Sequence, residues 1–423
     1  MNKSNKKDKL YNVKCIIFVL SMFLGFSNSY FMIIAFLMAI YLMFSKFNSF
    51  YFLALVSSFS QVFKLDSSSI SLFIFLPLIG IFPLIFYGVK NNKNIKLSSL
   101  VLVFLFCLYL LVFGRLNGEY IGFLQFIIPI VYSILLLSFH EINYEKAILF
   151  FSAGIIISGI SSFIYMFIPG LEDRMILSIV KENGIIFADR LSGLKMNPNH
   201  YSLDINIALS CMLLNLMRSK NKFRDIVIIS MLLFLGFSTL SRSFYAALLL
   251  LIILFILILI WQKKFFNWKV SVGLLFSSIL SVFLLRDQLF NFLMRLSGAN
   301  DDYTNGRADL FTEYLKDIFS SAYYFLFGHG LFAMNNKDLG THNFYLELLF
   351  TIGIFGTIIF IMLLKSTFFS MKFMVISYIP LLILLFRGMA INLFLKDTLY
   401  ILLIIIYAFM NNEKRKYLIA DIL

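Results

Sequence analysis

Residues 243–261 read SFYAALLLLIILFILILIW, a run without a single charged side chain. A helix needs roughly 20 predominantly apolar residues to cross the hydrocarbon core of a bilayer. The run is therefore predicted to form a membrane-spanning helix. Further apolar runs are found at 14–27, 30–45, 50–64, 69–89, 98–113, 120–138, 147–168, 199–217, 226–240, 270–285, 343–364, 373–386 and 398–410.

The overall composition agrees with a membrane protein. Apolar side chains make up 61% of the 423 residues and charged side chains 14%, against about a half and about a quarter in soluble domains. A water-soluble fold is therefore excluded. We predict one all-α, polytopic transmembrane helical bundle over residues 1–423, with about fourteen spans, or about twelve if short runs merge.

Two segments, 169–198 and 286–342, are too long and too polar to be simple connectors between spans. A long loop in a compact domain is usually functional or disordered. From Arg307 onward, apolar residues recur on one helical face and charged residues on the others. This spacing predicts an amphipathic helix at the membrane boundary, with its apolar face in lipid or on the bundle.

Lysine and arginine residues indicate how the chain is oriented, because positively charged flanks of short loops stay in the cytoplasm. With the N-terminus inside, most of the 36 Lys and Arg residues fall in inner segments, and the short outer loops are nearly free of them. Both termini are then cytoplasmic and both long loops are outside. The net charge of +14 reflects this topology and attraction to anionic membrane lipid, so no nucleic-acid partner is expected.

The first long loop ends in Arg190-Leu-Ser-Gly and Asn197-Pro-Asn199, directly before the span at 199–217. His200 and Asp204 are four residues apart, so they share one helix face and can pair. A carboxylate within a span is costly to ionise, which makes Asp204 a functional candidate. A structural hydrogen bond between helices is the alternative.

Two arginines lie at the outer boundary in the second half of the chain. Arg242 follows Ser241 in a very short connector and needs an anionic partner, either Glu347, Asp204 or a substrate phosphate. Arg307 falls in the first turn of the amphipathic helix, where free backbone amides favour anions. The structural alternative for Arg307 is that its side chain only reaches from the interface into water.

The second long loop leads into the span at 343–364. Thr341 is expected to cap this helix, which places His342 at its outer mouth and Glu347 about one turn deeper. Histidine changes charge near neutral pH and can act as a general base. His342 is therefore a catalytic candidate. The three cysteines lie in separate predicted spans and indicate neither a disulfide nor a metal site.

Four segments together resemble the O-antigen ligase and polysaccharide polymerase superfamily of bacterial membrane glycosyltransferases, whose bundles are GT-C-like. The resemblance covers roughly residues 185–360. Its segments are Arg190-Leu-Ser-Gly with Asn197-Pro-Asn199, Leu240-Ser-Arg242-Ser, Asn305-Gly-Arg307, and Gly328-His-Gly330 followed by Thr341-His-Asn343 and Gly353-Ile-Phe-Gly356.

The resemblance implies an enzyme of the bacterial plasma membrane that needs no metal or cofactor. It implies a transferase that moves a glycan from undecaprenyl diphosphate to an acceptor hydroxyl outside the cell. The divergence of this chain outside the four segments favours a polymerase, whose acceptor is another lipid-linked repeat unit, for a capsule, O-antigen or similar polysaccharide. A chain-length regulator and a flippase are the partners to be considered. Two alternatives stay open. One is a ligase that passes finished glycan to a different acceptor, and the other is a flippase or exporter of lipid-linked sugar.

The resemblance also assigns roles to particular residues. Its essential loop arginines correspond to Arg190 and Arg307, a further recurrent arginine to Arg242, and its loop histidine to His342. The arginines are expected to bind diphosphate, because their planar fork matches phosphate oxygens. His342 is the first candidate for the acceptor base, with Glu347 or the His200 and Asp204 pair in reserve. The expected substrate-binding set is Arg242, Asn199, His200, Asp204 and Asn343.

Overall fold

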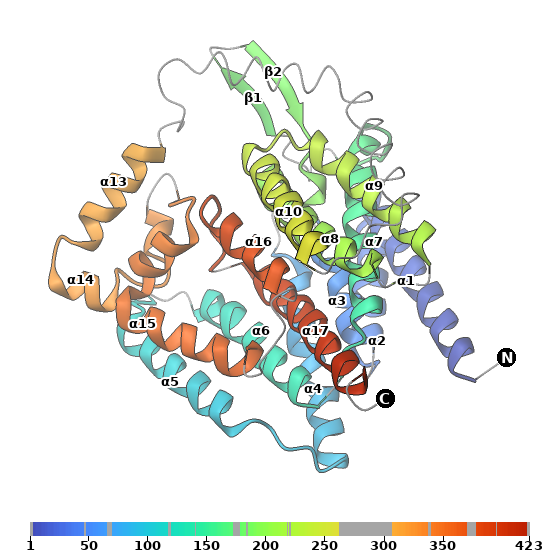
Figure 1. Ribbon diagram of the computed structural model, residues 1–423, viewed down its shortest axis with the longest axis horizontal. Helices are drawn as coiled ribbons and strands as arrows, with labels where there is room; N and C mark the ends of the chain where they lie inside the picture. The colour runs from blue at the N-terminus through green and yellow to red at the C-terminus, as the bar shows by residue number, and fades with distance from the viewer. Residues whose placement is uncertain are drawn as a thin grey trace. The chain divides into compact units, whose positions relative to one another are not determined.

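The computed structural model describes residues 3–45, 48–65, 70–116, 120–139, 141–171, 178–182, 185–217, 219, 221–261, 307–336, 340–369, 378–394 and 396–420. These residues form helices joined by short turns, together with one two-stranded hairpin (Figure 1). The prediction of a helical membrane bundle is confirmed. The predicted span at 270–285 and the second loop before Arg307 lie outside the described residues.

Several helices are suited to the interior of a bilayer. Five are long and apolar enough to cross a membrane, namely Lys9–Ser27, Leu72–Lys90, Gly122–Phe139, Tyr144–Phe163 and Phe344–Phe368. Six more are apolar but shorter, namely Ser29–Met43, Ser49–Phe59, Leu97–Phe113, Arg242–Leu257, Ile379–Gly388 and Thr398–Asn411. The chain is accordingly a multi-pass membrane protein.

The chain packs into two compact units. Unit 1 contains residues 1–92 and 145–241, and unit 2 contains residues 93–144 and 242–423. The elements of unit 1 are α1 (Lys3–Ser27), α2 (Ser29–Met43), α3 (Ser49–Val56), α4 (Phe75–Lys90), α7 (Tyr144–Phe163), β1 (Ser178–Glu182), β2 (Ile185–Arg190), α8 (Pro198–Leu216) and α9 (Lys222–Ser238). Those of unit 2 are α5 (Leu97–Phe113), α6 (Tyr120–Phe139), α10 (Arg242–Trp261), α13 (Arg307–Ile318), α14 (Ala322–Phe327), α15 (Phe344–Phe368), α16 (Ile379–Gly388) and α17 (Asp397–Ala420).

In unit 1, helix α8 is buried along almost its whole length. It carries Asp204, Asn206 and Asn215, so it is more polar than its neighbours. These polar groups need partners inside the protein, because lipid supplies none. Asn215, for example, donates a hydrogen bond to the Asp225 carboxylate of α9 at 2.9 Å. The buried polar chemistry of unit 1 is therefore concentrated on α8.

The first long loop contains the antiparallel hairpin β1–β2, which the sequence pattern did not predict. Ser178 pairs with Arg190, and the register shifts between Val180 and Lys181. The strand β2 ends at Arg190, so the hairpin places this arginine shortly before the start of α8. The hairpin is therefore part of unit 1.

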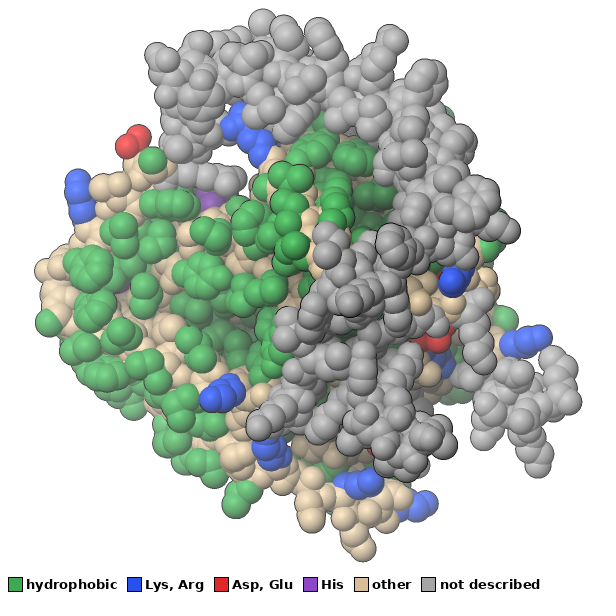
Figure 2. Space-filling view, viewed as in Figure 1, with side chains coloured by type: hydrophobic (Ala, Val, Ile, Leu, Met, Phe, Trp, Pro, Cys, Tyr) green, Lys and Arg blue, Asp and Glu red, His purple; other side chains and the backbone are tan. Residues whose placement is uncertain are grey.

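In unit 2, α15 and α5 present large apolar side chains on their outer surfaces. Phe104 and Val112 of α5 and Phe355 and Ile361 of α15 are each about half exposed or more. Figure 2 shows hydrophobic side chains spread over the area of α14 and α15 with few charges among them. Such a surface is stable in contact with lipid, and a soluble protein would rarely expose it.

Candidate functional site

The guanidinium of Arg190 lies at the end of β2 and is held by two acceptors in unit 1. Its Nε donates to the backbone oxygen of Thr239 at 3.1 Å, and its Nη2 donates to Oδ1 of Asn199 at 3.2 Å. The neighbouring backbone is tied down as well, because the Leu191 amide donates to the Ser238 oxygen. These contacts fix both the position and the plane of the guanidinium.

Asn199 links Arg190 to the turn that follows α9. The Ser241 hydroxyl, which is fully buried, donates to the same Oδ1 of Asn199 at 2.9 Å. Asn199 is placed by the predicted cap, since Oδ1 of Asn197 accepts the amides of Asn199 and His200. The turn itself is sharp, because Leu240 has a left-handed φ of +47°.

Three predicted elements of the site therefore meet within unit 1. The Arg190 segment, the start of α8 and the Thr239–Ser241 turn are separated in sequence, yet hydrogen bonds join all three. We call Arg190, Asn199, Thr239 and Ser241 the arginine cluster. Arg242, the next predicted site residue, directly follows this cluster in the chain and is the first residue of α10.

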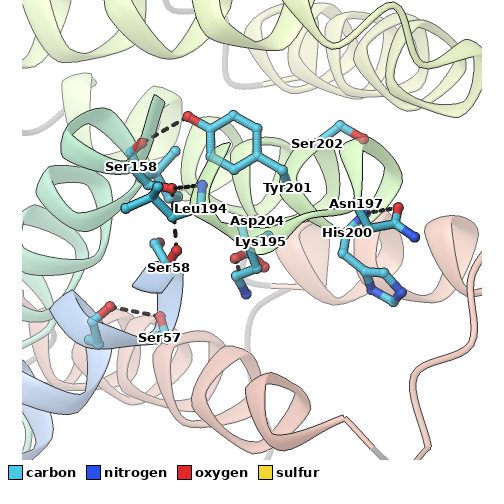
Figure 3. A network of polar contacts seen from close by, with 12 residues as sticks. Ser57, Ser58, Ser158, Leu194, Lys195, Asn197, His200, Tyr201, Ser202 and Asp204 are labelled. Carbon is cyan, nitrogen blue, oxygen red and sulfur yellow. Dashed lines mark hydrogen bonds and ion pairs between the residues drawn. The ribbon is translucent and has the colours of Figure 1, made fainter. Parts of the chain in front are cut away.

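Asp204 pairs with a residue that the sequence analysis did not select. Nζ of Lys195 lies 2.6 Å from Oδ2 of Asp204, with the two side chains 5% and 1% exposed. Figure 3 shows the His200 imidazole turned away from this carboxylate, so Lys195 takes the place proposed for His200. The signal in the sequence was a lysine shortly before a helix that carries a buried aspartate.

A network of polar contacts beside the ion pair holds the chain before α8 in place (Figure 3). The Leu194 amide donates to the Ser158 hydroxyl at 2.7 Å, and that hydroxyl donates to the Ser58 backbone oxygen at 3.2 Å. Gly193 has a φ of +56°, and a Cβ there would lie 2.6 Å from the Tyr201 ring. The segment that carries Lys195 is therefore packed tightly against α7 and α8.

In unit 2, His342 lies immediately before α15. It is half-buried and has a left-handed φ of +48°. The helix cap is Asn343, whose Oδ1 accepts the amides of Tyr345 and Leu346. The expectation that Thr341 caps this helix was wrong, because its hydroxyl bonds instead to Oδ1 of Asn392 at 2.7 Å and to the Asn343 oxygen.

Glu347 is buried one turn into α15, as predicted. Its Oε2 accepts the backbone amides of Leu393 and Phe394, at 2.7 and 3.0 Å. In these contacts Glu347 holds the chain between α16 and α17 close to the start of α15, which is a structural task. Its role as a reserve base stays a prediction.

The amphipathic helix α13 begins at Arg307, where the sequence predicted it. Tyr314 and Ile318 are fully buried and pack with Phe350 of α15, the Tyr314 and Phe350 rings meeting edge to face at 4.8 Å. Part of the apolar face therefore rests on protein, while Leu315 and Phe319 of the same face are exposed. The side chain of Arg307 lies outside the described set, so its role stays a prediction.

His329 has a structural role that the sequence did not reveal. Its imidazole stacks between the rings of Tyr324 and Phe350, at centroid distances of 4.0 and 4.4 Å. Its Nε2 lies 3.2 Å from the Asp317 backbone oxygen. The ring joins α13, α14 and α15, which explains a histidine at the edge of the loop without any catalytic role.

The loop after α14 is hydrogen-bonded to a break in α15. Gly353 interrupts the helix with a φ of +62°, and the oxygens of Phe350 and Thr351 accept the amides of His329 and Gly330. A Cβ on Gly353 would lie 2.5 Å from the Gly328 nitrogen, so the two backbones touch. In the apolar interior these carbonyls need protein donors, and the loop supplies them.

Arg115, just after the end of α5, lies beside this crossing. Its guanidinium lies over the rings of Tyr323 and Tyr324, at 5.3 and 5.4 Å. A hydrogen bond with the Tyr324 hydroxyl raises the pKa of Arg115. The adjacent Gly114 oxygen accepts the Leu331 amide at 2.7 Å. The end of α5 thus holds the loop in place from a second direction.

One comparison with known proteins found a match to part of the chain. Residues 226–361, about a third of the chain, match the family model described as O-antigen ligase. No curated protein and no solved structure matches the chain. The matched range includes the Thr239–Ser241 turn, Arg242, His342 and the break in α15. It agrees with the resemblance to the O-antigen ligase and polymerase superfamily.

Proposed function

We propose, with the O-antigen ligase match as premise, that this chain is a polysaccharide polymerase. It takes a glycan linked to undecaprenyl diphosphate and transfers it to a hydroxyl of another lipid-linked repeat unit. The reaction takes place at the outer face of the bacterial plasma membrane, with both chain termini in the cytoplasm. Its product is a capsule, an O-antigen or a similar surface polysaccharide.

The arginine cluster is the observation that carries the proposal. Departure of the lipid diphosphate develops negative charge, and a cation fixed in place beforehand stabilises that charge without reorganisation. Arg190 meets this requirement, because Thr239 and Asn199 orient its guanidinium. Each charge-assisted contact contributes on the order of 1.5 to 3 kcal/mol. We assign Arg242 and Arg307 to the same task.

His342 is proposed as the base that takes the proton from the acceptor hydroxyl. It lies at the mouth of α15 in a left-handed backbone conformation. Backbone strain of this kind is concentrated at functional sites. A positioned base contributes roughly 10²- to 10⁴-fold to such a transfer. Glu347 and His200 remain the reserve candidates.

Purified protein in liposomes, supplied with lipid-linked repeat unit alone, tests the function. The expected product is a ladder of longer glycans on the lipid. Elongation only after addition of a second acceptor would identify a ligase instead. Movement of the substrate across the bilayer without a new glycosidic bond would identify a flippase or exporter.

Variants in the same assay test the residues. Arg190→Lys keeps the charge but loses the fork, so it should lose most activity. Arg307→Ala should abolish long chains, whereas Lys316→Ala, which removes an exposed cation from the same helix, should not. Normal chain length in Arg307→Ala would remove Arg307 from the site, and retained activity in His342→Ala would pass the base role to a reserve.

A further inference from the structure

A cavity of about 360 Å³ lies in unit 1, where α1, the end of α2 and the turn before α3 meet. Its wall combines apolar side chains, from Leu10, Leu42 and Phe44, with polar ones. The polar part is Tyr11, Lys14, Tyr41, Ser45 and Asn48. None of these residues belongs to the arginine cluster or to the surroundings of His342. The function proposed above leaves this cavity without a role.

Two lysines from distant parts of the chain converge on this region. Nζ of Lys14 lies 2.7 Å from the Tyr41 hydroxyl and 4.4 Å from the centre of its ring. Nζ of Lys146, from α7, donates to Oδ1 of Asn48 at 2.9 Å. Lys146 also lies over the Tyr51 ring at 4.9 Å. Asn48 is shared, since it lines the cavity and accepts from Lys146.

The Tyr41 hydroxyl and ring hold the ammonium group of Lys14 without cancelling its charge, because both are neutral. Each ammonium has three N–H donors. The carboxylate next to Lys146 in sequence, Glu145, is directed to Arg224, with Oε1 2.9 Å from Nη2. Positive charge is therefore brought to the edge of a cavity that also offers hydroxyl and amide groups.

The apolar part of the wall favours a lipid over a soluble anion. Leu10 and Phe44 are more than half exposed, as is Tyr41. Apolar side chains this exposed at the end of a membrane helix are in contact with acyl chains. The proposed orientation puts the start of α1 and the turn after α2 on the cytoplasmic side. Anionic lipids of that leaflet attract lysines near the surface.

We propose that this cavity binds the phosphate-bearing head group of an anionic phospholipid in the inner leaflet. Lys14 contacts the phosphate oxygens, Lys146 adds positive charge next to Asn48, and the hydroxyls of Ser45 and Tyr41 donate further hydrogen bonds. The acyl chains run along Leu10 and Phe44. This site is separate from glycan transfer, and it ties α1, α2 and α7 to the lipid around them.

Native mass spectrometry of the detergent-purified full chain, titrated with dioleoyl phosphatidylglycerol, tests the proposal. Phosphatidylcholine with the same acyl chains is the comparison lipid and should bind more weakly. Lys14→Gln should weaken phosphatidylglycerol binding roughly fivefold, and adding Lys146→Gln roughly fivefold more. Lys222→Gln, which removes an exposed lysine of another inner segment, should leave the affinity unchanged.

Further measurements keep the outcome decisive. Ser45→Glu places a negative charge in the cavity while both lysines remain, so it should exclude phosphatidylglycerol even if Lys146→Gln fails to fold. Equal affinity for the two lipids would overturn the proposal, as would an equal loss in Lys222→Gln. Competition by millimolar glycerol 3-phosphate or inorganic phosphate would show a soluble anion site and overturn the assignment to lipid. Transfer activity should be retained by Lys14→Gln, so a failed lipid site leaves the proposed function intact.

Discussion

Replacing Asn199 by alanine removes the acceptor that Arg190 and Ser241 share. The contact with Arg190 is a hydrogen bond to a charged group, which contributes about 1.5 to 3 kcal/mol. The Ser241 hydroxyl is fully buried, and a buried hydroxyl that loses its acceptor costs about 1 to 3 kcal/mol. The first of these losses bears on the orientation of the guanidinium, and the second mainly on stability.

If Arg190 stabilises the leaving diphosphate, its misplacement lowers kcat/KM. A loss of about 1.5 to 3 kcal/mol of transition-state stabilisation corresponds to roughly 10- to 100-fold. The assay is elongation of lipid-linked repeat unit in liposomes, with the melting temperature of each variant measured in parallel. Asn221→Ala is the matched control, because it removes the side-chain cap of α9, at the end of that helix opposite to the Thr239–Ser241 turn, and should cost about 1 kcal/mol of stability.

Asn199→Asp separates the two functions of the side chain. It keeps an acceptor for Arg190 and for Ser241, and it adds a negative charge beside the guanidinium. We expect this variant to retain its melting temperature and to lose activity. Wild-type activity in Asn199→Asp, or an equal loss of activity in Asn221→Ala, would show that Arg190 does not act as a cation on the substrate.

Three further predictions concern stability, measured as melting temperature in detergent. Asp204→Leu alone should destabilise the protein by about 3 to 5 kcal/mol, because it leaves Lys195 buried with its charge uncompensated. Adding Lys195→Met should recover most of this loss. A double variant as unstable as Asp204→Leu would contradict the role of the ion pair. Gly353→Ala should destabilise the protein strongly, because the added Cβ would collide with the backbone of the loop after α14. Ile358→Ala, at an exposed position of the same helix, should be nearly neutral. Equal melting temperatures of the two variants would contradict the close backbone contact at Gly353. Tyr109→Phe removes the hydroxyl that donates to the Ile352 oxygen at 2.6 Å and should cost about 1 to 3 kcal/mol, and an unchanged melting temperature would show that this carbonyl has another donor.

Local rules predicted much of the structure. The apolar runs fall on helices wherever the chain is described, and Asn197 caps α8 as the residues Asn197 and Pro198 suggested. The start of α13 at Arg307 followed from the spacing of its apolar residues. Such features depend on neighbours a few positions apart, so a single sequence is enough to predict them.

The same local rules do not predict contacts between segments that are distant in the sequence. Thr341 and Asn343 are both capable caps, and the choice was made by Asn392, some fifty residues away, which binds the Thr341 hydroxyl. Asp204 had a suitable histidine one turn earlier, yet a lysine outside the helix is its partner. The break at Gly353 is stabilised only because the loop after α14 supplies amide donors. Partner choice of this kind depends on tertiary packing.

The crossing of Gly328 and Gly353 limits how relatives of this chain can exchange parts. The amides of His329 and Gly330 complete the backbone bonding of α15, so this loop and this helix form one folding unit. A chimera that takes its loop from one parent and α15 from another keeps these bonds only if both parents have glycine at the two crossing positions, because a Cβ at either would collide with the other backbone. Chimeras should therefore be joined before Arg307 and after Phe368, and natural recombination is expected to occur at the same boundaries.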